Sequence, residues 1–133
     1  MGMGLADIRD WLKGLDAIDA AAWSIGRIDA SKERSVGVYS RPDYGAPEVA
    51  VGGEACTRTK VKRASVLVHW NRNHRETEEA ALGLYDALAF NPRAEVGGCA
   101  VSYVDLRLPE PVDAGSDGSG VFERVIWLDL HYE

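Results

Sequence analysis

The chain has 133 residues, of which 46% are hydrophobic and 27% charged, a composition typical of one globular domain with its own core. The formal net charge is −6 and is uneven: residues 1–66 carry ten Lys/Arg and nine Asp/Glu, whereas residues 67–133 carry five and twelve. The acidic second half argues against nucleic acid as the main ligand. Apolar runs are shorter than the roughly 20 residues that cross a bilayer, and acids near the N-terminus argue against a secretory signal.

The first half of the chain predicts a helix, two strands and a long connection. Leu5, Ile8, Leu12 and Leu15 recur three and four residues apart, which predicts a helix over residues 5–22. Residues 24–28 and 34–39 are predicted strands joined by a polar turn, and we expect them to form a hairpin. Residues 40–57 contain prolines and glycines without periodicity, which predicts a long loop, and residues 59–70 form the longest strand.

The second half predicts a helix and two more strands. Asn73 is a candidate N-cap followed three residues later by Glu76, a capping-box pattern, and the apolar spacing then predicts a helix to residue 88. Its packed face comprises Thr77, Ala81, Leu84 and Leu88. After a turn-rich link over residues 90–98, we expect strands over residues 100–108 and 121–132.

This order predicts an α+β fold with a mainly antiparallel sheet and two helices packed on one face. The element order is α-β-β-(long loop)-β-α-β-β, in one domain spanning residues 1–133.

The patterns that support catalysis or metal binding are weak. The histidines His69, His74 and His131 do not share a helix face, and Cys56 and Cys99 lack the spacing of a zinc site, so we expect no metal and no cofactor. Residues 113–118 (DAGSDG) resemble a calcium loop, but glycine stands at its third place and arginine at its twelfth. No phosphate loop, nucleophile elbow or dinucleotide fingerprint occurs. We therefore do not expect an enzyme.

One basic cluster stands out in the otherwise acidic chain. It comprises Arg58, Lys60, Lys62 and Arg63, and alternate residues of it share one side of an extended segment. Cations of this kind protect an exposed strand edge from pairing with other sheets. We interpret the cluster as such an edge or as a contact with another subunit, in preference to DNA binding.

Three segments of the chain resemble the minor capsid proteins of tailed phages that infect Gram-positive bacteria. They are SIGRIDASKERSVGVYSRP, VLVHWNRNHRETEEAALGLYDAL and LPEPVDAGSDGSGVFERVIWLDLHYE, and they run in matching order from Ser24 to the end. The most specific pattern comprises His69, Trp70, Asn71, Glu76, Thr77, Glu78, Ala80, Ala81, Leu84 and Tyr85. A second pattern comprises Glu110, Pro111, Val112, Asp113, Gly115, Asp117 and Gly120.

By size and element order, this family is similar to phage tail terminators. The resemblance implies a virion protein, assembled in the host cytoplasm, that forms a homohexameric ring on the tail tube. Such a ring stops tube polymerisation and meets the head connector, with tube protein, connector and sister subunits as partners and DNA only passing through an acidic lumen. No membrane partner is implied.

The two loops are the expected docking elements, because loops on a rigid scaffold carry function. In residues 41–56 we select Arg41, Asp43, Tyr44, Glu48 and Val51. In residues 113–120 we select Asp113, Ser116, Asp117 and Ser119, and we expect both loops to be disordered in the free subunit. The alternatives are a stopper subunit in the neck and, from another class, a small nuclease with magnesium held by Glu76, Asp129 and His69.

Overall fold

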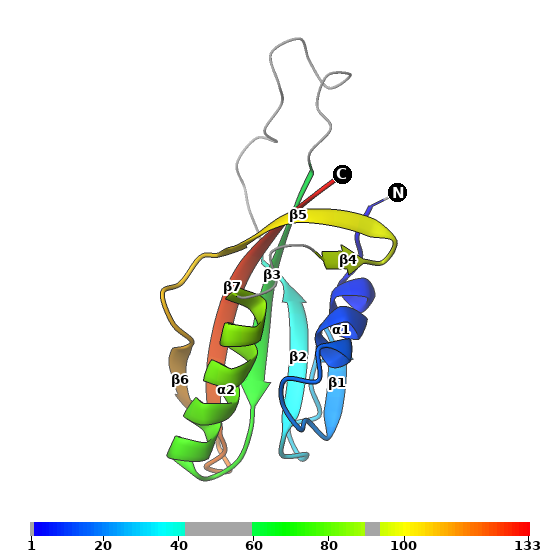
Figure 1. Ribbon diagram of the computed structural model, residues 1–133. Helices are drawn as coiled ribbons and strands as arrows, with labels where there is room; N and C mark the ends of the chain where they lie inside the picture. The colour runs from blue at the N-terminus through cyan, green and yellow to red at the C-terminus, as the bar shows by residue number, and fades with distance from the viewer. Residues whose placement is uncertain (1, 42–59, 90–93) are drawn as a thin grey trace.

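The computed structural model describes residues 2–41, 60–89 and 94–133 of the chain. These residues form two helices and a curled, mixed, seven-stranded sheet, so the protein is α+β (Figure 1). Neighbouring strands follow the order β1-β2-β3-β7-β5-β4, and β6 pairs with β7. The elements are α1 (Leu5–Gly14), β1 (Ala22–Ile25), β2 (Ser35–Ser40), β3 (Lys60–His69), α2 (His74–Ala89), β4 (Ala94–Val96), β5 (Cys99–Leu106), β6 (Val112–Ser116) and β7 (Phe122–Tyr132).

The hydrophobic core lies between the helices and one face of the sheet. Side chains alternate between the two faces along a strand, and here every second residue is fully buried from Ala64 to Val68 in β3 and from Ile126 to Leu130 in β7. Ile8 and Leu12 of α1 and Leu84 and Leu88 of α2 complete the same core, and both helices cover the same face (Figure 1). The sheet residues that meet them are Val36, Val38, Ala64, Val66, Val68, Ile126, Leu128 and Leu130.

The helix α1 is shorter than its apolar pattern predicts. It ends at Gly14, and Asp16 adopts a positive φ of 51°, a conformation that a helix does not contain. Ile18, which we expected on the same helix, instead packs against Gly83 of α2 from the segment that follows. The apolar spacing of residues 5–22 thus identified residues that pack on the core, but only the first part of them is helical.

The start of α2 confirms the predicted N-cap and corrects the partner of Glu76. The Oδ1 atom of Asn73 accepts a hydrogen bond from the Glu76 N–H at 3.1 Å. The Asn73 N–H, however, donates to Oδ1 of Asn71 at 2.9 Å, and Glu76 accepts from the Asn71 amide at 2.7 Å. The acid therefore acts through Asn71 and not by reaching back to the cap itself. The packed face of α2 is confirmed, because Thr77, Ala80, Ala81, Leu84 and Leu88 are buried.

The predicted hairpin of the first two strands is wrong. β1 and β2 are parallel, with Ala22 opposite Ser35 and Ile25 opposite Val38. The connection over residues 26–34 returns along the sheet and places Ile28 over Gly37, where a Cβ atom would come within 2.5 Å of the Ile28 side chain. Gly37 therefore makes room for the crossover that makes this pair parallel. The other strand pairs are antiparallel.

Two strands were not predicted, so the element order differs from the expected one. β4 forms a tight hairpin with β5, and Gly97 and Gly98 take φ values of 58° and 78° in its turn. β6 lies in the predicted loop over residues 113–120 and pairs with the first part of β7, while β5 pairs with the last part of the same strand. Since β3 occupies the other side of β7, β5 and β6 share one side of it.

Candidate interaction surface

The sheet has one face without a helix among the described residues, here called the open face (Figure 1). It is formed by the residues that alternate with the core positions, and the strand register places them side by side. The crossover over residues 26–34 covers the end of this face near Gly37. The remaining open-face residues include Arg41, Val61, Arg63, Ser65, Leu67, Tyr103, Asp105, Arg107, Val112, Val125, Trp127, Asp129 and His131.

Large exposed apolar side chains gather on the open face. Trp127 is 42% exposed, Tyr103 57% and Val112 44%, and each follows from its register position. Tyr103 lies beside His131, with 5.5 Å between the ring centres. Exposed large apolar side chains that share one face are typical of interaction sites, and Trp, Tyr and Arg are the residues that most often carry binding energy. We therefore identify the open face as the candidate interaction surface.

Three arginines and two aspartates form a charged cluster on the same face. Asp129, only 8% exposed at its side chain, forms an ion pair with Arg41 and lies 3.8 Å from Nε of Arg63 and 3.9 Å from Nε of Arg107. Arg107 also pairs with Asp105 at 2.9 Å, and this hydrogen bond, with the charges of Asp105 and Asp129, raises the pKa of Arg107. The cluster carries one more positive than negative charge.

Arg41 links the charged cluster to the aromatic surface. Its guanidinium carbon lies 5.4 Å from the centre of the Trp127 ring, which is a cation–π contact. Its Nη1 atom is buried and has no hydrogen-bond partner among the described residues. Asp129 holds the Arg41 side chain from one side and Trp127 from another. Arg41 is therefore preorganised, as arginines in protein interfaces often are.

At the end of the open face that lies away from Arg41, neighbouring segments of the chain pack around His69. This residue is completely buried, and its Nδ1 lies 3.0 Å from Glu123 while its Nε2 lies 3.2 Å from the carbonyl oxygen of Ala30. A carboxylate oxygen of Asp117 is 3.8 Å from the same Nε2. His69 is thus a buried residue of the sheet whose contacts join the crossover, β7 and the β6–β7 turn.

The residues selected as docking elements in the second loop take part in a β-hairpin with β7, and their docking role stays a prediction. Asp113 accepts the Gly115 N–H at 2.8 Å, and Asp117 accepts the N–H groups of Ser119 at 2.8 Å and Val121 at 3.0 Å. These hydrogen bonds lower the pKa of both acids, and a hydrogen bond with His74 lowers the pKa of Asp113 further. Ser116 is paired with Phe122, so the expected flexible loop is wrong for the residues of β6.

The basic cluster does not form one patch. Lys60 and Lys62 lie opposite Tyr132 and Leu130, on the helix-covered side of the sheet, whereas Arg63 lies on the open face beside Asp129. Alternation along β3 separates them. Of the predicted partner residues, Asp43, Tyr44, Glu48, Val51 and Arg58 lie outside the described part of the chain, as does Cys56; Cys99 is a buried free thiol.

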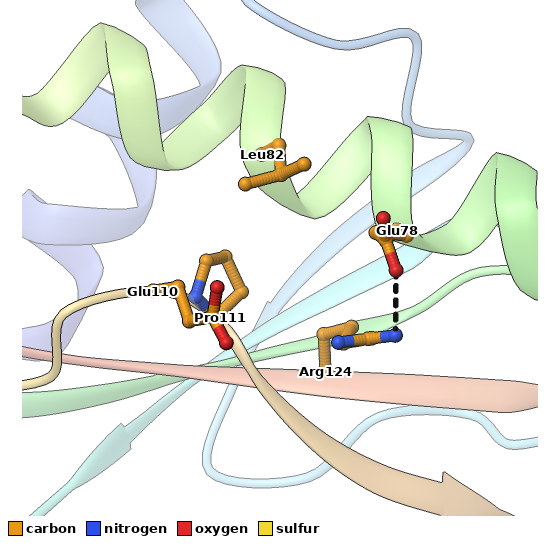
Figure 2. Close-up of a pocket in the computed structure, with 5 residues that line it drawn as sticks. All are labelled: Glu78, Leu82, Glu110, Pro111 and Arg124. Atoms are coloured by element: carbon orange, nitrogen blue, oxygen red, sulfur yellow. Dashed lines mark hydrogen bonds and ion pairs between the residues drawn. The ribbon is translucent and has the colours of Figure 1, made fainter.

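A small pocket lies between α2 and the segment that enters β6 (Figure 2). Arg124, one of its lining residues, has a side chain that is only 11% exposed and pairs with Glu78 at 3.2 Å. Glu110 and Pro111 line one side and Leu82 the other (Figure 2). Because the Arg124 guanidinium is already bound to Glu78 and lies near His74, we interpret the Arg124–Glu78 contact as one that holds α2 against β7.

The proposed magnesium triad is not assembled. His69 is paired with Glu123 at one end of β7 and Asp129 with Arg63 six residues further along, while Glu76 is on α2 behind the sheet. Within residues 2–41, 60–89 and 94–133, no group of three His, Cys, Asp or Glu side chains is arranged to hold a metal ion. Neither described helix has the length and apolar content needed to cross a membrane.

The chain matches no protein-family model and no curated protein. Its likeness to phage minor capsid proteins therefore stays a prediction from the residue patterns given above.

Sequence reasoning missed Trp127 and Arg107 as members of the surface. The signal was available in part, because Val125, Trp127, Asp129 and His131 alternate with the apolar residues of the last strand. An alternation that places tryptophan opposite the core marks an exposed aromatic. The convergence of three arginines on Asp129 had no such local signal.

Proposed function

We propose that this chain is a structural virion protein of a tailed phage, a tail terminator that forms a ring at the end of the tail tube. Its role is to stop tube polymerisation and to join the tube to the head connector. Tube protein, connector and sister copies are then its partners, and DNA only passes through the ring.

The single observation that carries this proposal is the open face of the sheet. A subunit whose function is geometric requires a rigid scaffold with a preorganised contact surface, and here Arg41, Trp127 and Asp129 provide one on a sheet backed by a full core. The resemblance of the residue patterns to minor capsid proteins supports the tail as the place where such a surface acts. The α+β class with two helices supports a terminator over a stopper, because a stopper would be expected as a small β-rich barrel with fewer helical residues.

The test is negative-stain electron microscopy of particles from a phage that lacks this gene. We expect tails of uncontrolled length beside separate, DNA-filled heads. Tails of normal length beside heads that have lost their DNA would contradict a terminator and assign the chain to the neck. Complete, joined particles without a structural defect would contradict a role in the virion altogether.

A further inference from the structure

Both ring nitrogens of the buried His69 face oxygen atoms. The Nδ1 atom lies 3.0 Å from a carboxylate oxygen of Glu123, and the Nε2 atom lies 3.2 Å from the carbonyl oxygen of Ala30. A carboxylate oxygen of Asp117 is 3.8 Å from the same Nε2. Because His69 is completely buried, water cannot replace these partners at the ring.

Only a doubly protonated ring can donate to both neighbours. A neutral imidazole has one N–H donor and one acceptor nitrogen, whereas the imidazolium has two donors. The Ala30 carbonyl and an ionised Glu123 only accept, so a neutral ring would turn a lone pair towards one of them. Burying a charge is costly unless it is paired, and here Glu123 and Asp117 supply the counter-charge.

The charged groups that face His69 come from two of the segments packed around it. β7 supplies Glu123, and the β6–β7 turn supplies Asp117. The crossover supplies the Ala30 carbonyl, while every charged side chain of residues 26–34 is exposed, and β2 supplies the uncharged Ser35 opposite His69. Arg72 acts on Asp117, whose pKa is lowered by backbone N–H groups and, less strongly, by the charges of His69 and Arg72.

The bond from His69 to the Ala30 carbonyl holds the middle of the crossover. The two ends of the crossover are fixed by backbone hydrogen bonds to β2 and to the residue that follows β3. Between these ends, residues 29–34 are all exposed, so little buried surface of their own keeps them in place. The attachment at His69 is therefore the contact most able to control this segment.

We infer that His69 carries two ring protons in the folded chain at neutral pH, and that the second proton keeps the crossover on the open face. A hydrogen bond to a carboxylate is stronger than one to a neutral carbonyl, so a ring that loses one proton keeps its bond to Glu123 and releases Ala30. The attachment is present near neutral pH and is lost as the pH rises and the folded chain gives up this proton. The crossover is thus a pH-dependent cover over one end of the candidate interaction surface, and this does not depend on the proposed function.

The test is nuclear magnetic resonance of the full chain with isotope-labelled histidine, with Glu123→Gln as the variant. In this variant the glutamine amide can donate to Nδ1 while the Nε2–H still donates to Ala30, so a neutral ring satisfies both neighbours. Glu79→Gln is the matched control, because it removes the same charge from an exposed position of α2. The chain has three histidines, so His74→Gln and His131→Gln assign the ring signals.

In the wild-type chain and in Glu79→Gln, we expect N–H groups on both ring nitrogens of His69 at about pH 7.5, where a histidine in a short peptide is about nine-tenths neutral. The nuclear Overhauser effect between the Ile28 methyl groups and Gly37 reports whether the crossover is in place. It should fall roughly twofold or more between about pH 7 and about pH 9.5. In Glu123→Gln the ring should carry only the Nε2 proton at about pH 7.5, and the Ile28–Gly37 effect should be the same at both pH values.

Four results would overturn the inference. The first is a single ring N–H on His69 in the wild-type chain at about pH 7.5, and the second is a wild-type ring that keeps both protons at about pH 9.5. The third is an Ile28–Gly37 effect that stays constant while the wild-type ring loses its proton. The fourth is a crossover that detaches at high pH in Glu123→Gln as it does in Glu79→Gln, which would assign the change to another titrating group.

Discussion

The guanidinium of Arg41 lies 5.4 Å from the centre of the Trp127 ring on the face of the sheet that neither helix covers. The same arginine forms an ion pair with the buried Asp129. Arg41 directly follows β2, whereas both partners are in β7, and β3 lies between these strands. The contact therefore spans three strands and fixes an otherwise flexible side chain, which gives the surface a defined shape.

Removing the carboxylate of Asp129 should destabilise the fold strongly. In Asp129→Ala the guanidinium of Arg41 keeps its buried position without a counter-charge, and we expect the free energy of unfolding to fall by about 3 kcal/mol. Urea unfolding measures this. The matched control is Asp105→Ala, whose partner Arg107 is more than half exposed, and for which we expect less than about 1 kcal/mol. Equal losses in the two variants would contradict a special role for Asp129.

Two leucines of α2 should differ sharply in their contribution to stability. Leu84 is fully buried, so Leu84→Ala should cost about 2–5 kcal/mol through lost burial and the cavity that remains. Leu82 is 37% exposed and only lines the small pocket on the outer side of α2, so Leu82→Ala should cost no more than about 1 kcal/mol. Unfolding at a concentration where the chain is monomeric provides the comparison. A large loss for Leu82→Ala would show that it packs within its own subunit.

Replacing His69 should weaken the closed end of the sheet. His69→Phe preserves volume but leaves Glu123 and the Ala30 carbonyl without their hydrogen-bond partner, at an expected cost of about 1–3 kcal/mol. Hydrogen exchange should then increase over residues 26–34. His131→Gln, at the other end of the open face, is the control and should be close to neutral. Unchanged exchange over residues 26–34 in His69→Phe would contradict the joining role.

The acid stability of the chain should depend on Asp117. The N–H groups of Val121 and Ser119, together with the charges of His69 and Arg72, lower the pKa of this carboxyl from its usual 3.8. Because the folded state favours the ionised form, its contribution to stability is present above the unfolded pKa and is lost as the pH falls through the folded pKa. We expect Asp117→Asn to be less stable than wild type at pH 7 and the difference to shrink below pH 3.8. Thermal unfolding of both proteins over this pH range checks the sign, and a constant difference would contradict it.

The capping network at the start of α2 should contribute measurably. Asn73→Ala removes the acceptor for the Glu76 N–H, and we expect a loss of about 1 kcal/mol. Asn73→Asp retains an acceptor at the same place and should be close to neutral. If both variants lose the same stability, the side-chain acceptor is not the cause.

The helix α2 could be predicted in detail, because its signals are local: a cap at Asn73, an acid three residues later and apolar side chains at helical spacing. The direction of β1 relative to β2 could not be predicted in this way. It depends on Ile28 packing over Gly37, a contact between residues that no short pattern relates. β6 was missed because all five of its residues are exposed, so it lacks the alternation by which strands are recognised.

The open-face cluster could be predicted only in part. Arg41 and Arg63 were selected from the sequence, but as members of two separate surfaces, and the register of β3 with β7 is what brings Arg63 to Asp129. Arg107 reaches the same aspartate from beyond β5. A register is set by the whole sheet, whereas charge patterns along the chain report only on neighbours in sequence.

The most direct measurement is complementation of an extract from the gene-deleted phage, which supplies heads and tails without this chain. Purified wild-type chain added to the extract should restore joined, infectious particles. The double variant Trp127→Ala with Tyr103→Ala removes the exposed aromatic side chains of the open face and, although folded, should not restore joined particles. The control Ile25→Lys, at an exposed position of the edge strand β1, should restore them. An extract that the wild-type chain leaves unjoined, or that the double variant restores to the same titre, would contradict the proposal that the open face assembles a tail terminator.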